Sequence, residues 1–485
     1  MSKFLPKLNP EVRIKTAKRC KKHNIVIPTF QQLKNPELIP QEIKDQLKEI
    51  GLWDINPLNL YRITWKNDIK TGLFGDVNYL EIPREITGTK ARVIGLVGKY
   101  FPTGAHKVGA AFGCLVPRLI TGEFDPEYHK AVWPSTGNYC RGGAFDCALL
   151  DCTAVAILPE EMSQERFTWL KEIGSEVFAT PGCESNVKEI YDKCAELRPD
   201  PHYMIFNQFD EFGNPLFHYH ITGSAIEEVF QKVKNDDSKL SAYISATGSA
   251  GTIAAGDYLK KLHPHMTTTA TEALQCPTLL MNGFGGHRIE GIGDKHIPWI
   301  HNTRNTDNIA AIDDDDCMRL LRLFNTPEGQ KYLEKEGVSP QLINDLPLLG
   351  ISSICNLIAA VKTAKYYEMD ENDVIFTIFT DSAEMYLSRL DELQEQEGKY
   401  TVCQAKADHL ACILKQGIDF YKELSYYDRK AIHNLKYYTW IEQQGKELEE
   451  LNRQWQPEYW DELFDEKELE FIDDKIVEFN ELIKQ

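Results

Sequence analysis

The segment SAYISATGSAGTIAAGDYLKKL, residues 241–262, carries the pattern that decides the fold. An apolar run typical of a buried strand leads into a glycine-rich turn at residues 248–252, and a helical pattern begins directly after it. Backbone amides converge at such a turn and the helix dipole adds partial positive charge, which suits a phosphate group. The segment has neither the GK[ST] of a P-loop nor GxGxxG spacing. By itself, the turn predicts either a phosphate cradle or an ordinary structural turn.

The same alternation of strand and helix continues from Asn56 to Glu392. Short apolar runs such as ARVIGLVG, TAVAIL, HYMIFN and DVIFTIF are separated by helical stretches. Continuous apolar strands between helices are typical of a parallel sheet that is covered on both faces. This part of the chain is therefore predicted to be α/β, with enough strands for two adjacent sheets.

Both ends of the chain differ from this middle part. Residues 1–55 are polar, lysine-rich and interrupted by proline, which predicts an ordered extension. After Glu392, apolar residues recur at three- and four-residue spacings, which predicts a helical C-terminal extension over residues 393–485. Its aromatic side chains are expected to pack against the parent domain or a partner subunit; they are Tyr437, Tyr438, Trp440, Trp455 and Trp460.

Composition excludes several classes of protein. The 485 residues suit two to four domains, and 54 lysines and arginines against 73 aspartates and glutamates give a formal charge of −19. An acidic chain of this kind argues against nucleic-acid binding, and the negative charge is concentrated in the C-terminal extension. No apolar stretch approaches the roughly 20 residues that span a bilayer, and the N-terminal segment lacks the apolar core of a secretory signal. We therefore expect a cytoplasmic protein without membrane partners.

No metal site is expected. The 12 cysteines are scattered without a CxxC pair, and reduced, buried thiols are the simplest interpretation. His218 and His220 are expected to share a face of a strand, but no third ligand follows at metal-like spacing.

Two further loops carry residues with chemical potential. Lys107 begins a predicted helix within PTGAHKVG, directly after the strand ARVIGLVG, although lysine normally stays solvated. A buried lysine can lose its proton and form a Schiff base with a carbonyl group, whereas a surface position would give it no such role. The loop PSTGN at residues 134–138 could bind a carboxylate, and an ordinary helix N-cap explains Ser135 equally well.

Together these loops resemble the fold-type-II pyridoxal-phosphate enzymes, the group of cysteine synthase and tryptophan synthase β. The resemblance covers roughly residues 56–392, and TGAHK is closer to tryptophan synthase β, whereas the later segments are closer to cysteine synthase. The matching segments are HK (106–107), PSTGNY (134–139), PEEMSQER (159–166), NQFDEFGNP (207–215), GSAGT (248–252), TEA (271–273), HRIEGIG (287–293), GISSICN (350–356) and DSAEMYLS (381–388).

This resemblance implies two three-layer α/β/α domains of the tryptophan synthase β-like type. A large cofactor-binding domain would consist of residues 56–97 and 213–392, and a small domain of residues 98–212 would carry the substrate loop. The N-terminal extension, residues 1–55, and the helical C-terminal extension, residues 393–485, would lie outside both. The resemblance also implies a homodimer.

The resemblance assigns a role to each matching residue. Lys107 would hold pyridoxal 5′-phosphate as a Schiff base and act as acid and base at the substrate Cα, and Asn138 would bond the pyridine 3′-oxygen. Ser382 would bond the pyridine nitrogen; Asp381 is the rival, because neighbouring strand residues face opposite ways. A neutral hydroxyl there makes the cofactor a weaker electron sink, which favours β-elimination and β-replacement over transamination. The phosphate would be held by Gly248, Ser249, Ala250, Gly251 and Thr252, and the amino-acid substrate by Ser135, Thr136, Gly137, Tyr139 and Gln208.

The resemblance predicts an enzyme that carries out β-replacement or β-elimination of the cysteine-synthase type on an amino acid. Tyr139 and Cys140 depart from the Thr-Gly of the family's substrate loop and place an aromatic ring and a thiol near the substrate. This change and the long chain leave open a lyase or thiolase similar to the β subunit of 2-amino-4-oxopentanoate thiolase, which has a small partner subunit. A non-catalytic cofactor-binding scaffold with a partner-binding tail is the alternative outside enzymes.

Overall fold

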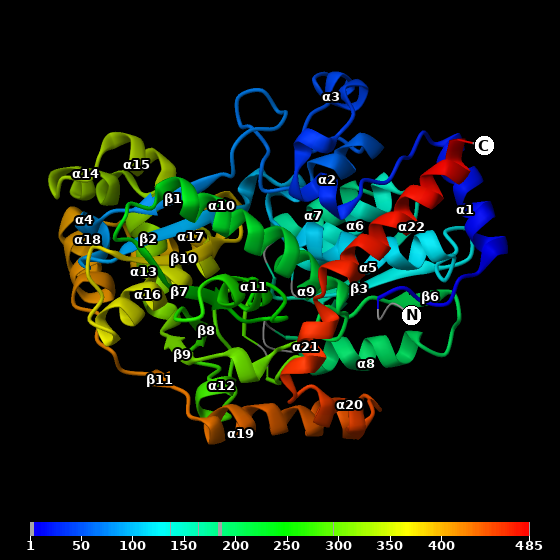
Figure 1. Cartoon of the computed structure of the whole chain (residues 1–485). Helices are drawn as coiled ribbons and strands as arrows, with labels where there is room; N and C mark the ends of the chain where they lie inside the picture. Colours follow the sequence, from blue (N-terminus) through cyan, green and yellow to red (C-terminus); the bar gives the residue numbers. More distant parts are fainter. Residues whose placement is uncertain (1–3, 136, 163, 183–186, 294, 485) are drawn as a thin grey trace.

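Two β-sheets organise the chain. The computed structural model describes residues 4–135, 137–162, 164–182, 187–293 and 295–484 (Figure 1). The larger sheet has seven strands in the order β1-β2-β10-β7-β8-β9-β11, and the smaller has four in the order β5-β4-β3-β6. The pairs β1–β2 and β11–β9 are antiparallel and all other neighbours are parallel. The prediction of an α/β protein with two adjacent sheets is confirmed.

Several of the strands coincide with the apolar runs of the sequence. The larger sheet contains β1 (Tyr79–Ile82), β2 (Arg92–Val97), β7 (Lys239–Ala246), β8 (Thr267–Ala273), β9 (Asn308–Ile312), β10 (Asp373–Phe379) and β11 (Tyr421–Glu423). The smaller sheet contains β3 (Lys130–Pro134), β4 (Thr153–Pro159), β5 (Glu176–Thr180) and β6 (Tyr203–Ile205).

Helices cover both faces of each sheet, which explains why the strands are apolar throughout. In β10, Phe376 joins the core that contains α10 (Gly223–Val233) and α11 (Ala254–Leu262), whereas its neighbour Ile375 joins the core of α13 (Asp314–Asn325) and α16 (Ile351–Tyr366). In the smaller sheet, β3 (Lys130–Pro134) packs Trp133 toward α5 (Lys107–Thr121) and α6 (Asn138–Leu149), and Val132 toward α8 (Val187–Leu197).

Two glycines allow α5 to lie directly against α9 (Gly213–Phe217). A Cβ atom on Gly113 would overlap the carbonyl oxygen of Gly213, and one on Gly213 would overlap that of Gly113. The two backbones therefore touch at this point, which brings the helix of Lys107 close to the segment of Gln208.

Replacing Gly113 by alanine is expected to lower the free energy of unfolding by about 3 kcal/mol, because a backbone atom cannot yield as a side chain can. Urea denaturation measures this change. Gly75→Ala is the control, since its nearest neighbour would be a side-chain oxygen of Asp68 at 3.3 Å, whereas the new Cβ of Gly113→Ala would overlap a backbone atom. Equal midpoints for the two variants would contradict the close backbone contact.

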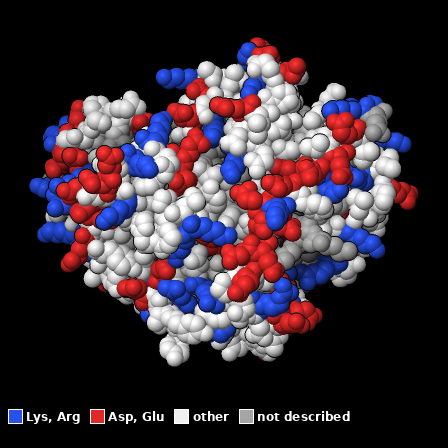
Figure 2. Space-filling view, in the orientation of Figure 1, with Lys and Arg blue, Asp and Glu red and all other residues white. Residues whose placement is uncertain are grey.

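The first and last helices of the chain lie side by side. Helix α1 (Pro10–Lys22) packs along α22 (Glu466–Lys484), and both cover α5 (Figure 1). Asp473 of α22 accepts backbone hydrogen bonds from Phe30 and Gln31, so it satisfies free N–H groups at the start of α2 (Phe30–Lys34). Acidic side chains gather over α21 (Pro457–Leu463) and α22 (Figure 2).

The predicted C-terminal helical region is confirmed, with one addition. Strand β11 extends the larger sheet beyond β9, where Lys422 pairs with Ile309. After β11 the chain forms α19 (Tyr426–Lys436), the π-helical segment η10 (Tyr437–Gln443) and α20 (Leu448–Arg453) before α21 and α22.

One local prediction is wrong. His218 and His220 lie in the π-helical segment η5 (His218–Thr222), between α9 and α10, and both are fully buried. The alternating letters HYHIT indicated a strand, but every residue of this segment is buried, as in a helix inside a core. No single helix in the described part of the chain is long and apolar enough to cross a membrane; α15 (Pro340–Asp345) with its following turn and α16 meet those criteria only as a pair bent by 116°.

Candidate active site

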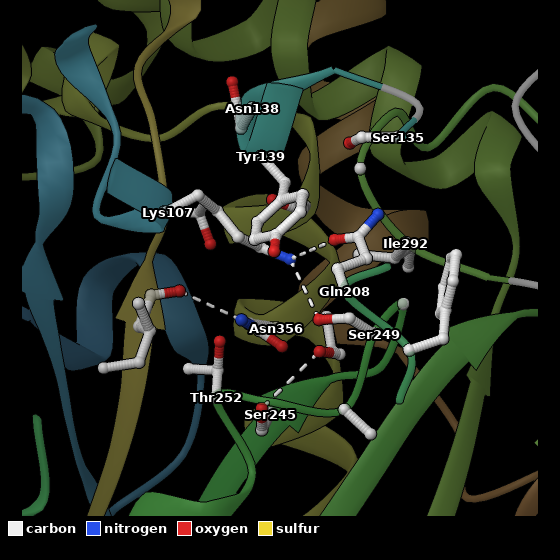
Figure 3. Close-up of a pocket in the computed structure, with 18 residues that line it drawn as sticks. Lys107, Ser135, Asn138, Tyr139, Gln208, Ser245, Ser249, Thr252, Ile292 and Asn356 are labelled. Carbon is white, nitrogen blue, oxygen red and sulfur yellow. Dashed lines mark hydrogen bonds between the residues drawn. The ribbon is translucent and has the colours of Figure 1, made fainter. Parts of the chain in front are cut away.

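A pocket opens where loops from both sheets meet α5 and α16 (Figure 3). It brings together most of the residues singled out in the sequence. Its lining includes Lys107, Ser135, Asn138, Tyr139, Gln208, Gly248, Ser249, Ala250 and Thr252. It also includes residues to which the sequence gave no individual role, several of them within the matched segments: Phe209, Ser245, Ala246, Gly291, Ile292, Ser352, Asn356, Ile378 and Thr380.

The amine of Lys107 faces the glycine-rich loop. Lys107 is the first residue of α5, after a turn in which Thr103 and Gly104 adopt positive φ angles of 70° and 71°. Its Nζ donates hydrogen bonds to Ser249 Oγ at 3.3 Å and to Gln208 Oε1 at 3.4 Å (Figure 3). The lysine, the proposed phosphate loop and the proposed carboxylate-binding glutamine therefore converge on one point.

The glycine-rich loop keeps backbone amides available. Among the described residues, the backbone N–H groups of Gly248, Ser249 and Ala250 have no hydrogen-bond acceptor, as expected of a loop that binds a phosphate. Ala250 has a φ of 60°, a left-handed conformation that costs an L-residue about 1–2 kcal/mol. Glycine would adopt this backbone conformation without that cost.

Asn214 connects this loop to Gln208. Its Nδ2 donates to Ser249 Oγ at 3.1 Å and to the Gln208 carbonyl oxygen at 2.9 Å. The side chain is fully buried, and a Cβ atom on Gly251 would overlap it. Sequence reasoning did not single out Asn214, although it lies within the matched segment NQFDEFGNP.

Asn138 is turned toward Asp381. Its Nδ2 donates to Asp381 Oδ2 at 2.7 Å, and Figure 3 shows its side chain directed away from Lys107. Asp381 also accepts from the Tyr386 hydroxyl at 2.7 Å, and burial raises the pKa of this carboxyl group. Binding of the pyridine 3′-oxygen by Asn138 stays a prediction and requires the amide to rotate.

In the described part of the chain, the Ser382 hydroxyl does not reach the pocket, whereas those of Ser352 and Thr380, beside α16 and β10, do. Among the residues described, neither Ser382 nor Asp381 belongs to the pocket lining, and the buried Ser382 hydroxyl has no hydrogen-bond partner. Ser352, in the first turn of α16, and Thr380, after β10, do line it. The assignment of Ser382 to the pyridine nitrogen stays a prediction, and Ser352 and Thr380 are the alternatives. Ser352 lies within the matched segment GISSICN.

Thr380 is held by a neutral imidazole. Its Oγ1 lies 3.3 Å from His106 Nε2. Burial, and secondarily the charge of Lys107, lower the pKa of His106 to about 3, so that the ring is uncharged at neutral pH.

Gly137, in the predicted substrate loop, lies against a buried arginine. Ser135 Oγ accepts a hydrogen bond from the Gly137 N–H at 3.1 Å, and a Cβ atom on Gly137 would overlap the guanidinium of Arg166. Arg166 forms an ion pair with Glu290 at 3.3 Å. Thr136, predicted to bind the substrate carboxylate, lies outside the described residues.

Of the two departures from the family's loop, Tyr139 reaches the pocket and Cys140 does not. The Tyr139 ring lines the pocket and packs edge-on against Trp133 at 5.4 Å. The Cys140 thiol donates to the Gly137 carbonyl at 2.9 Å, and burial raises its pKa to about 12, which keeps it protonated. The described residues contain no cluster of three or more histidine, cysteine or acidic side chains able to hold a metal ion.

The geometry of an amine beside an amide-lined loop defines a class of protein. Residues 99–332 match the family model of the pyridoxal-phosphate dependent enzymes. A cysteine synthase from Staphylococcus aureus is 32% identical over 288 residues, which cover 59% of this chain and 84% of the relative. A probable cysteine synthase from Bacillus subtilis is 29% identical over 318 residues, which cover 65% of this chain and 94% of the relative.

Solved structures agree with this relationship. A hydrogen sulfide-producing enzyme from Fusobacterium nucleatum is 26% identical with a TM-score of 0.54, over 64% of this chain and 96% of that one. An O-acetylserine dependent cystathionine β-synthase from Helicobacter pylori is 23% identical with a TM-score of 0.53, over 64% of this chain and 94% of that one, and supports the fold. The chain belongs to the family of pyridoxal-phosphate-dependent enzymes. Within it, the chain is a homologue of the cysteine synthases, with the fold-type-II architecture.

The residues of the pocket fit this cofactor. Lys107 offers an amine within hydrogen-bond distance of the glycine-rich loop, and that loop presents backbone N–H groups without acceptors. The buried Asn138 Oδ1 has no partner among the described residues. These groups match the aldehyde, the phosphate and the polar ring substituents of pyridoxal phosphate.

Proposed function

We propose that the protein catalyses β-replacement or β-elimination on an amino acid with a serine- or cysteine-like side chain. Lys107 supplies the amine for the Schiff base that holds pyridoxal phosphate. The observation that carries the proposal is the position of Lys107 Nζ between Ser249 and Gln208, at 3.3 and 3.4 Å. The names of the relatives, cysteine synthases among them, support the same reaction class.

The residues of the pocket have separate catalytic, cofactor-binding and substrate-binding roles in this proposal. The bound cofactor supplies an electron sink that makes the substrate Cα–H acidic. Lys107 Nζ takes that proton and later returns one, while backbone amides of residues 248–252 hold the phosphate. Ser135, Gln208 and the backbone of Gly137 orient the substrate carboxylate, and the Tyr139 ring excludes water beside it. A neutral hydroxyl at the pyridine nitrogen, from Ser382 or one of its rivals Ser352 and Thr380, favours β-chemistry over transamination.

The direct test is incubation of the protein with O-acetylserine and sulfide. Cysteine should form at a rate that is proportional to protein concentration, because both substrates are those of a β-replacement of the cysteine-synthase type. A colorimetric assay for cysteine measures this rate. Absence of cysteine above the protein-free rate would contradict the cysteine-synthase assignment.

A second candidate is a lyase or thiolase similar to the β subunit of 2-amino-4-oxopentanoate thiolase. The observation that favours it is the Tyr139 ring in the pocket lining, where the family's loop has a smaller residue. Cleavage of 2-amino-4-oxopentanoate that depends on coenzyme A would support this candidate over the first, as would a requirement for a small partner subunit. A cofactor-bearing protein inactive in both assays would favour the scaffold alternative.

We also propose the division into a large domain, residues 56–97 and 213–392, and a small domain, residues 98–212. The separate seven- and four-stranded sheets support this division. A homodimer and a cytoplasmic location are proposed from the family resemblance, and sedimentation of the purified protein tests the dimer.

A further inference from the structure

The C-terminal extension forms part of the wall behind the pocket. After α19 the chain turns through η10, and Trp440 within it is fully buried. Trp440 belongs to one apolar cluster with Phe209, which lines the pocket, and with Trp299. Its indole Nε1 donates to the Ile297 carbonyl oxygen at 2.7 Å. A residue more than a hundred positions beyond the family match at 99–332 thus packs within the active-site wall.

Residues 296–301, which Trp440 contacts, in turn contact Phe209. The His296 ring lies 4.9 Å from the ring of Phe209 and 5.7 Å from that of Trp440. The Ile300 N–H donates to the Phe209 carbonyl at 3.3 Å. Lys436 Nζ adds hydrogen bonds to the carbonyl oxygens of Trp299 and His301, at 2.8 and 2.7 Å.

A second contact from the C-terminal extension is made with Asp210, the residue after Phe209. Lys446 Nζ forms an ion pair with Asp210 Oδ2 at 2.8 Å. The Asp210 N–H donates to the Asn207 carbonyl at 3.1 Å, so residues 207–210 form a turn with Gln208 inside it. The last two residues of this turn, Phe209 and Asp210, are therefore both held by contacts that involve the C-terminal extension.

The same cluster includes the smaller sheet's outer helix. The Tyr191 hydroxyl of α8 lies 3.0 Å from His296 Nε2, and its ring lies 6.3 Å from that of Trp440. The contact network therefore joins the small sheet, the pocket wall and the C-terminal extension.

We infer that Trp440 and Lys446 are positioning residues that fix the turn at residues 207–210, so that Gln208 meets Lys107 and the substrate carboxylate. The role of Gln208 toward substrate rests on the proposed function. Asn214 holds the phosphate loop from outside the extension. Trp440 and Lys446 act instead on the turn at residues 207–210, so loss of their contacts should weaken amino-acid binding far more than cofactor binding.

Hydrogen exchange tests the inference without activity. Lys446→Ala and Asp210→Ala should each speed exchange in peptides that contain Phe209, Asp210 and Ile300 by about fivefold. The exchanged pair Lys446→Asp with Asp210→Lys should restore slow exchange. Lys475→Ala is the matched control. Lys475 also forms an ion pair in the C-terminal extension, with Glu478 at 2.6 Å, but both residues belong to α22 and, within the described structure, neither pairs with the turn.

Amino-acid binding gives the functional readout. The holoenzyme is titrated with O-acetylserine and with L-serine, and the cofactor absorbance reports saturation. The apparent dissociation constant should rise about threefold to fivefold in Lys446→Ala. It should rise about tenfold in Trp440→Phe, which keeps an aromatic ring but removes part of the buried indole and leaves the Ile297 carbonyl without its donor. Affinity of the apoprotein for pyridoxal phosphate should stay within about twofold of wild type, since the surviving interactions at the phosphate are unchanged.

The experiment distinguishes failure of the proposed function from failure of the positioning role. A wild-type holoenzyme whose absorbance responds to no amino acid would refute the proposed function. A responsive wild type, with variants that match it in both amino-acid affinity and exchange at the turn, would refute the positioning role alone. Lys446 and Asp210 are partly exposed, so their variants should fold even if Trp440→Phe does not.

Discussion

Replacing Lys107 by alanine is expected to abolish covalent attachment of pyridoxal phosphate and to lower turnover by at least about 10³-fold. Lys107 Nζ lies within hydrogen-bond distance of both Ser249 and Gln208, so the variant removes the amine at the point where the phosphate loop and the substrate side of the pocket meet. Alanine can neither form the covalent link nor carry a proton to or from the substrate Cα.

Borohydride reduction followed by peptide mass spectrometry measures the attachment. In wild type, the reduced cofactor should be found on the peptide that contains Lys107, and the variant should carry none. Lys99→Ala is the control, since Lys99 lies in the same strand-to-helix connection but pairs with Glu384 near the surface. Reduced cofactor on another lysine of wild type, or full turnover by Lys107→Ala, would overturn the assignment.

Replacing Gly251 by alanine is expected to weaken pyridoxal phosphate binding by about 10-fold to 100-fold, the equivalent of an overpacking cost of about 1–3 kcal/mol. The new Cβ would overlap the side chain of Asn214, which is fully buried and cannot swing aside. Because Asn214 donates to both Ser249 Oγ and the Gln208 carbonyl, its displacement should disturb the phosphate loop and the carboxylate side together.

Titration of the apoprotein with pyridoxal phosphate, followed by protein fluorescence, measures this affinity. Gly75→Ala serves again as the control for a glycine-to-alanine change, because its new Cβ would approach no atom more closely than 3.3 Å. Ala250→Gly should bind the cofactor at least as well as wild type, since glycine adopts the φ of 60° without cost. Wild-type affinity in Gly251→Ala would show that the loop does not hold the phosphate.

Much of the fold could be predicted because its signals are local. The apolar runs SAYISA and DVIFTIF became β7 and β10, and the glycine-rich turn at residues 248–252 connects β7 to α11 as expected. Strand β11 is three residues long and has no apolar run of its own, so pairing with β9 could be recognised only in the folded chain. The letters HYHIT misled for the converse reason, since alternation cannot distinguish a half-buried strand from a fully buried helix.

The composition of the site was largely readable, but the direction of its side chains was not. Lys107, Gln208 and Ser249 come together across 101 and 142 residues of sequence, and collinear motifs were sufficient to name all three. Whether Ser382, Ser352 or Thr380 meets the cofactor ring depends on how the chain leaves β10 and enters α16, which no spacing in the sequence expresses. The same holds for Asn138, whose amide is drawn to Asp381, a residue 243 positions away.

The segment at residues 241–262 determined, from sequence alone, that this chain builds a strand, a glycine-rich turn and a helix, because each of those elements depends on neighbours along the chain. Tertiary structure decided that Asn214 supports that loop. It also decided that Trp440 and Lys446, from the C-terminal extension, hold the two residues that follow Gln208. These contacts join residues with no shared pattern, and they exist only because packing of the whole core fixes where each side chain can go.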